Sequence, residues 1–312
     1  MKRARPYLTR LLRYGRVSLF LKSCFGSGKK GMDLWYNKTM EKRTAIKLNT
    51  RRDPRLDILR GVTLVSMIIY HGCWDLVYLL GFDWDWYKGT GAWLWQQSIC
   101  WTFILLSGYC WSMGRHHLKR GLMTFGAGLL VSLVTIVAMP SSMILCGVLT
   151  LLGSAALFMI LLDPVLRRVD WRVGLVLSFL LFFVFRSVNQ GWLGLSLGGK
   201  IGGIALMELP EYLYQMGLIG AWIGFMPRNF FSTDYFSILP WFFLFCAGYF
   251  LRKKTEAQAT GRPTASQSEA VAAGEQGILS RSLQWMGRHS LLVYLIHQPA
   301  LYGLCMVISL IM

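Results

Sequence analysis

A histidine and an aspartate four residues apart interrupt an apolar stretch of this chain, His71 and Asp75 in the run LVSMIIYHGCWD at 64–75. An ionisable side chain inside a membrane span is costly unless it faces a cavity or a partner. Histidine is also the side chain best suited to proton transfer near neutral pH. On a helix the i, i+4 spacing places both groups on one face, so the carboxylate can orient the imidazole ring and raise its basicity. The pair predicts a centre that catalyses a reaction or binds a substrate. The alternative is a structural histidine that is hydrogen-bonded to a neighbouring helix.

A second histidine, His297, lies in the equally apolar run YLIHQP near the C-terminus. We predict that it belongs to the same catalytic centre. The alternative is that it satisfies backbone carbonyls released by a kink at Pro299.

Asp57, Arg60 and Arg288 form a different kind of candidate site, because they lie at the predicted inner ends of the first and last spans. Arginine can bind anionic groups through paired N–H donors. The alternatives are an interfacial salt bridge and anchor for Asp57 and Arg60, and a topology determinant for Arg288.

The elements that position these residues are predicted to be membrane helices. The chain of 312 residues is 54% hydrophobic and only 15% charged, with a mean hydropathy of +0.43, whereas soluble domains are nearer a quarter charged. The fold class is therefore an all-α polytopic bundle of about seven spans, each about 20 residues long. Their ranges are 57–80, 93–114, 121–139, 143–162, 173–187, 235–251 and 290–312, while the interrupted stretch 201–225 is interpreted as an interfacial or re-entrant hairpin.

The distribution of positive charge predicts a cytosolic N-terminus. With this orientation the inner loops contain twelve Lys or Arg residues and the outer loops only three, which are Lys88, Lys200 and Arg228. Short cytosolic loops are enriched in these residues. The prediction is a multi-pass protein of the plasma membrane.

Two segments are predicted to lie outside the bundle. Residues 1–50 form a basic cytosolic arm, and up to residue 56 the chain has sixteen Lys/Arg against three acids, a net +13 of the total +18. We interpret the arm as a solvated topology determinant that can contact anionic lipid, and expect no nucleic-acid partner because no recognised fold accompanies the charge. Met32 and Met40 are alternative translation starts. The polar loop 254–277 is predicted to be disordered.

Cysteine usage predicts neither a disulfide framework nor a metal site. The seven cysteines are dispersed, form no CxxC pair and fall mostly inside spans. No metal is expected, so the chemistry must come from a few ionisable groups in the bundle.

Three motifs resemble one family. They are RLDILRG at 55–61 followed by Tyr70-His71, DYFSILPW at 234–241, and GRHSLLVYLIHQP at 287–299, with FILLSG at 103–108 fitting the second span. Together they resemble the catalytic domain of heparan-α-glucosaminide N-acetyltransferases, a group of transmembrane acyltransferases. The resemblance covers 51–312, which we treat as one domain.

The resemblance implies transfer of an acetyl group from cytosolic acetyl-CoA to an amine or hydroxyl of a sugar-like acceptor on the other face of the membrane. His71, Asp75 and His297 would then be catalytic, and Asp57, Arg60 and Arg288 would bind acetyl-CoA. The alternative function is a transporter or proton-coupled flippase that uses the intramembrane His and Asp groups as a relay. A homodimer is an open alternative to a monomer.

Overall fold

The computed structural model describes residues 53–198, 201–260 and 277–311. Its contacts set Pro54–Met312 apart as one compact unit. The predicted arm at 1–50 lies outside the described residues, as does most of the polar loop predicted at 254–277. The first part of that predicted loop is helical, because α10 continues as far as Thr260.

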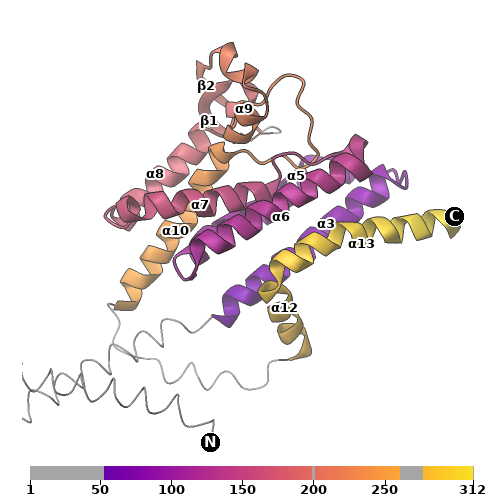
Figure 1. Cartoon of the computed structure of the whole chain (residues 1–312), viewed down its shortest axis with the longest axis horizontal. Coiled ribbons are helices and arrows are strands. Elements are labelled where there is room, and N and C mark those ends of the chain that lie inside the picture. The colour runs from indigo at the N-terminus through magenta and orange to yellow at the C-terminus, as the bar shows by residue number, and fades with distance from the viewer. Residues whose placement is uncertain (1–52, 199–200, 261–276, 312) are drawn as a thin grey trace, which may run out of the picture. The chain divides into compact units, whose positions relative to one another are not determined.

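Helices dominate the unit Pro54–Met312 (Figure 1). The long ones are α3 (Pro54–Tyr78), α5 (Thr90–Trp111), α6 (His117–Ala138), α7 (Val148–Leu166), α8 (Trp171–Val184), α10 (Ile238–Thr260) and α13 (Ser290–Ile311). The shorter ones are α4 (Asp85–Lys88), α9 (Gly217–Ile223) and α12 (Ile278–Arg288). Local sequence explains two helix starts. Pro54 is the first residue of α3, where its missing N–H costs nothing, and Asp170 caps α8 by accepting the Arg172 N–H at 2.8 Å.

Five helical segments of the described chain are long and apolar enough to cross a membrane. They are Pro54–Tyr78, His117–Ala138, Val148–Leu166, Trp171–Gln190 and Ser290–Ile311. This supports a multi-pass helical membrane protein. The other two predicted spans, 93–114 and 235–251, also fall on helices, α5 and α10, so the count of seven stays a prediction, as does the cytosolic N-terminus.

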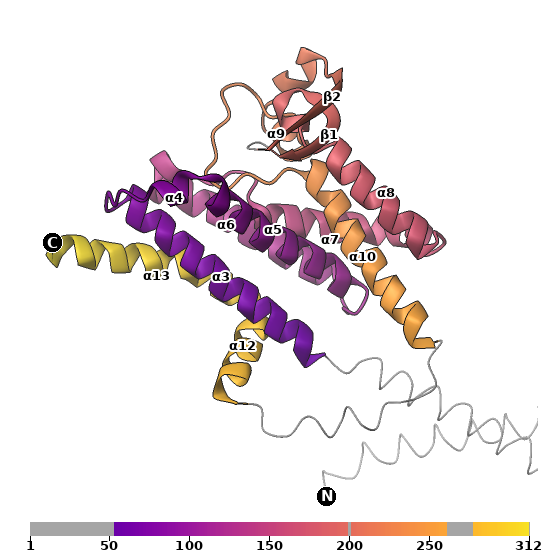
Figure 2. The same cartoon turned by 180° about the vertical axis from the view of Figure 1, so that it is seen from behind.

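The segment after α8 contains a feature that an all-α prediction omits. Strands β1 (Trp192–Gly198) and β2 (Gly202–Glu208) pair antiparallel, and the short α9 follows them. The stretch 201–225, predicted as an interfacial or re-entrant hairpin, thus begins with one strand of a β-hairpin. All of β2 is exposed, and the views place the hairpin at one end of the helices (Figures 1 and 2).

The main core lies between α5, α7, α8 and α10 and contains Ile104, Leu151, Phe182, Leu244 and Phe245. The axes of α5 and α10 approach closely because each contributes a glycine. A Cβ on Gly108 would collide with the Phe245 carbonyl, and one on Gly248 with the Leu105 carbonyl. Small residues of this kind allow membrane helices to pack backbone to backbone.

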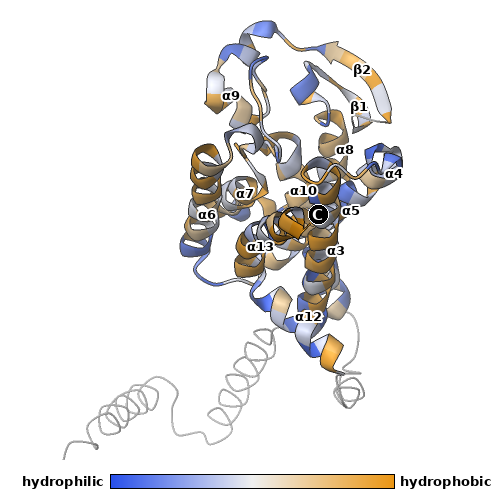
Figure 3. Ribbon diagram, turned by 90° about the vertical axis from the view of Figure 1, so that its right-hand side faces the viewer, coloured by the Kyte–Doolittle hydropathy of each residue, from blue (hydrophilic) through white to orange (hydrophobic). Residues whose placement is uncertain are grey.

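Apolar residues cover the helices along most of their length (Figure 3). Many large apolar side chains on them are exposed, including Leu133 at 60%, Leu161 at 77% and Leu310 at 84%. Such a surface is expected where lipid tails are the solvent.

Candidate active site

Helices α3 and α13 lie side by side and run in the same direction (Figures 1 and 2). Their register is set by two contacts, in which His71 faces His297 and Asp75 faces Gln298. All three predicted catalytic residues therefore gather at one interface. His71 and Asp75 share the face of α3 that meets α13, as their i, i+4 spacing predicts.

The two histidines form the centre of this interface. Their ring centroids are 5.1 Å apart with the planes inclined by 58°. His297 is only 8% exposed, while His71 is half-buried. Tyrosine rings flank the pair, since Tyr70 lies 6.0 Å from His71 and Tyr294 lies 5.2 Å from His297.

A backbone contact orients the His297 ring. Its Nδ1 lies 2.5 Å from the carbonyl oxygen of Tyr294, so a hydrogen bond there requires the proton on Nδ1 and leaves a lone pair on Nε2. Nε2 is buried, with no hydrogen-bond partner among the described residues. Pro299 has no N–H, so the carbonyl four residues earlier, that of Leu295, lacks its helical hydrogen bond. His297 contacts the carbonyl of Tyr294 and not that of Leu295, so it does not replace the missing hydrogen bond.

Asp75 is fully buried at 0% exposure, and its hydrogen-bond partner lies on the facing helix α13. Its Oδ1 accepts the side-chain N–H of Gln298 at 3.1 Å. Oδ2 has no partner in the described part of the chain, and neither does Gln298 Oε1. The role of Asp75 in orienting His71 stays a prediction, because the hydrogen bond found for its carboxylate comes from Gln298 on the facing helix. The result is a pair of buried acceptor atoms that lack donors.

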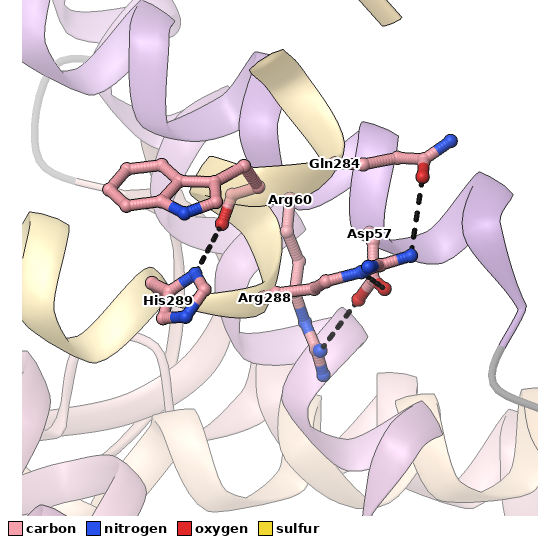
Figure 4. Close-up of polar contacts among 6 residues, drawn as sticks. Asp57, Arg60, Gln284, Arg288 and His289 are labelled. Atoms are coloured by element: carbon pink, nitrogen blue, oxygen red, sulfur yellow. Dashed lines mark hydrogen bonds and ion pairs between the residues drawn. The ribbon is translucent and has the colours of Figure 1, made fainter. Parts of the chain in front are cut away.

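The predicted phosphate-binding residues meet at the start of the same helix pair (Figure 4). The Asp57 carboxylate is 1% exposed and accepts from Arg288 Nε at 3.4 Å, while Arg60 Nη1 lies 3.8 Å away. Arg288 Nη2 also donates to Gln284 Oε1 at 3.3 Å. Two guanidinium groups thus face one buried carboxylate, and half of the Arg288 side chain remains exposed. This donor set fits phosphate groups.

Two glycines allow this cluster to form. A Cβ on Gly61 would meet the Leu283 carbonyl, and a Cβ on Gly287 would meet the Asp57 carbonyl. The backbones of α3 and α12 therefore touch, and the neighbouring Arg288 is brought over Asp57. Fourteen residues of continuous helix separate Asp57 from His71, about 21 Å at 1.5 Å per residue.

Asp234, which the sequence analysis did not select as a site residue, connects the histidine pair to α7. Its Oδ2 accepts the Val148 N–H at 3.4 Å, at the first turn of α7, and lies 3.5 Å from the Tyr294 hydroxyl. Burial raises the pKa of Asp234 to about 6, and the two hydrogen bonds partly oppose this shift. The DYFSILPW motif that contains Asp234 was the available signal.

The comparison with protein families agrees with the geometry. The model for the catalytic domain of heparan-alpha-glucosaminide N-acetyltransferase matches residues 52–299. The chain belongs to this family. Membership confirms the resemblance and indicates a transmembrane acetyltransferase. No curated protein and no solved structure matches the chain.

Proposed function

We propose that this protein transfers an acetyl group from cytosolic acetyl-CoA to an amine or hydroxyl of a saccharide-type acceptor at the opposite face of the plasma membrane. The N-terminus would lie in the cytosol. The observation that carries the proposal is the contact between His71 and His297 on two adjacent apolar helices, with the cluster of Asp57, Arg60 and Arg288 at the start of the same pair. Proton-transfer groups and phosphate-binding groups thus share one interface.

The cation cluster is proposed to hold the phosphates of CoA. Asp57 fixes the arginines in place, and the exposed part of Arg288 is directed to the phosphates, which are too strongly charged to enter the bilayer. The thin pantetheine arm would then extend along α3 toward His71, about 21 Å away by helix rise.

Proton transfer is assigned to the histidine pair. The acceptor nitrogen or oxygen attacks the thioester carbon, the C–S bond breaks, and the acceptor's proton passes to His71 as general base. The departing CoA thiolate then takes this proton from His71, which restores the base. The buried lone pair on His297 Nε2 makes His297 a second proton acceptor beside His71. A two-step route, in which His71 first carries the acetyl group as a covalent intermediate, uses the same residues.

Asp75 and Gln298 are proposed to bind the acceptor. Their two buried oxygens without donors in the described chain, Asp75 Oδ2 and Gln298 Oε1, suit the N–H or O–H groups of a sugar. Asp75 would therefore position the acceptor rather than the imidazole ring.

Calorimetric titration of CoA into the purified, detergent-solubilised protein tests the donor site. We expect binding that weakens at least about tenfold in Arg60→Ala and Arg288→Ala, since each removes charge-assisted hydrogen bonds, while Arg168→Ala, an exposed arginine of the loop after α7, serves as the control. Slow acetyl-CoA hydrolysis without acceptor is also expected. A folded wild-type sample that binds no CoA contradicts the proposal and favours a transporter.

A further inference from the structure

Arg186 is the most unusual charged residue outside the site described above. It follows the C-terminal end of α8, near the β-hairpin, and its guanidinium carbon lies 4.4 Å from the ring centroid of Trp241 and 5.6 Å from that of Phe182. Aromatic faces compensate part of the cost of holding a cation away from water. They do not supply a counter-charge.

The hydrogen bonds of Arg186 leave most of its donors unused. Nη2 donates to Gln97 Oε1 at 2.6 Å, whereas Nε is buried with no acceptor in the described ranges. The ion pairs found there join Arg60, Lys88, Arg167, Arg228, Arg252 and Arg288 to carboxylates, but none includes Arg186. A half-buried cation with a buried Nε and no counter-ion among the described residues, within an apolar bundle, is a candidate functional site.

The surroundings keep the guanidinium in place and leave room beside it. Trp101 Nε1 also donates to Gln97 Oε1, at 3.2 Å, so the amide oxygen is held between two donors. Gly198, at the end of β1, has φ of +117°, and a Cβ there would lie 3.2 Å from Arg186 Nη2 and 3.0 Å from the Trp93 ring. Only glycine leaves this space open.

We propose that Arg186 and Gln97 form a binding site for a carboxylate or phosphate group on a ligand that enters from the hairpin end of the bundle. Arginine donates to such groups through two parallel N–H bonds. The nearby tryptophans provide flat apolar faces for the rest of the ligand. The anion belongs either to an acidic saccharide or to a lipid headgroup, and the charge chemistry is the same for both.

Helix α5, which carries Gln97, also contacts α3 of the histidine pair, since Trp95 Nε1 donates to Ser66 Oγ at 2.8 Å. We therefore assign the ligand at Arg186 to the acceptor of the proposed transfer. This assignment to the acceptor rests on the proposed function, whereas the anion site itself does not.

The test uses the full chain in neutral detergent and measures binding of glucuronate, inorganic phosphate and neutral glucose by calorimetry and thermal shift. In an Arg288→Ala background, which removes the competing anion contact at the cluster of Asp57, Arg60 and Arg288, we expect glucuronate or phosphate to bind and glucose not to. Arg186→Gln should weaken anion binding at least about tenfold. Arg186→Lys should weaken it less, because lysine keeps the positive charge but lacks the two parallel N–H donors. Arg228→Gln, which removes an exposed arginine paired with Glu211, should leave binding unchanged.

Gln97→Glu tests the site without removing the arginine. The new carboxylate is isosteric with the amide and would pair with Arg186, so the variant should fold, melt at a higher temperature and lose anion binding. Equal anion binding in the wild type and Gln97→Glu overturns the proposal. A wild type that binds glucose as tightly as it binds glucuronate or phosphate also overturns it.

Nanodiscs distinguish the two sources of the anion. If an equimolar mixture of phosphatidylglycerol and phosphatidylcholine raises the melting temperature of the wild type over phosphatidylcholine alone, and Gln97→Glu lacks this shift, the ligand is a lipid headgroup. A glucuronate response without this lipid response identifies a soluble acid, and the absence of both refutes the site. CoA binding, measured in the same samples, reports separately on the proposed function.

Discussion

The imidazole rings of His71 and His297 lie 5.1 Å apart at the interface of α3 and α13, although the first and last long helices of the described chain supply them. The same interface joins Asp75 to Gln298, 223 residues apart in sequence. The groups that we propose for proton transfer and acceptor binding therefore depend on one helix pair.

Replacing His71 with alanine should lower acetyl transfer by a factor of about 10² to 10⁴, the usual contribution of a general base. The protein should remain folded and bind CoA normally, because the cation cluster lies about 21 Å away. Radiolabelled acetyl transfer and CoA calorimetry measure the two effects. His116→Asn is the control, since His116 is exposed and has a left-handed φ of 58° that asparagine tolerates. If His71→Ala transfers acetyl groups at the wild-type rate, His71 is not the general base.

Asp75 and Gln298 should behave as a coupled pair in a double-mutant cycle. Gln298→Leu leaves the buried Asp75 carboxylate without its observed donor and should destabilise the protein by about 1–3 kcal/mol. Asp75→Asn with Gln298→Leu should be less harmful than the sum of the single changes, with a coupling of about 0.5–3 kcal/mol. Thermal unfolding of the four proteins provides the energies. Strict additivity would mean that the 3.1 Å contact does not contribute to stability.

Gly287→Ala should weaken CoA binding although the residue carries no functional group. The added methyl group would collide with the Asp57 carbonyl, separate α12 from α3 and cost about 1–3 kcal/mol in stability. Arg288 would then lose its position over Asp57. Gly303→Ala is the matched control, because nothing lies within 4 Å of a Cβ at Gly303 on α13. If both variants bind CoA equally well, close packing of α12 on α3 is not what forms the donor site.

Asp234 should give the protein a measurable pH dependence of stability. Its pKa is about 6 in the folded protein against an ordinary value of 3.8, so the folded state favours the protonated form. The stabilisation from protonation is fully present below about pH 4 and is lost as the pH rises through 6. Melting temperatures of the wild type should therefore contain a falling component between these values that Asp234→Asn lacks. Parallel curves for the two proteins would exclude Asp234 as its source.

Much of the architecture could be predicted because membrane helices are determined by local composition. Apolar length alone predicts α3, α6, α7, α8 and α13 as spans. The β-hairpin was missed, since its strands are short, rich in glycine and apolar enough to resemble an interrupted span. Arg186 was also missed, although an arginine inside the predicted span 173–187 was a visible signal.

The sequence by itself determined which groups lie along one helix. The 3.6-residue period places His71 and Asp75 on one face of α3, and the helical rise places Asp57 about 21 Å and Arg60 about 17 Å from His71. Only the tertiary structure decided which partners these groups have. Asp75 pairs with Gln298, Asp57 pairs with Arg288, and His297 faces His71. A side chain on a helix bonds to the nearest suitable group on the facing helix, and the distance between two residues in the sequence does not tell which helix that will be.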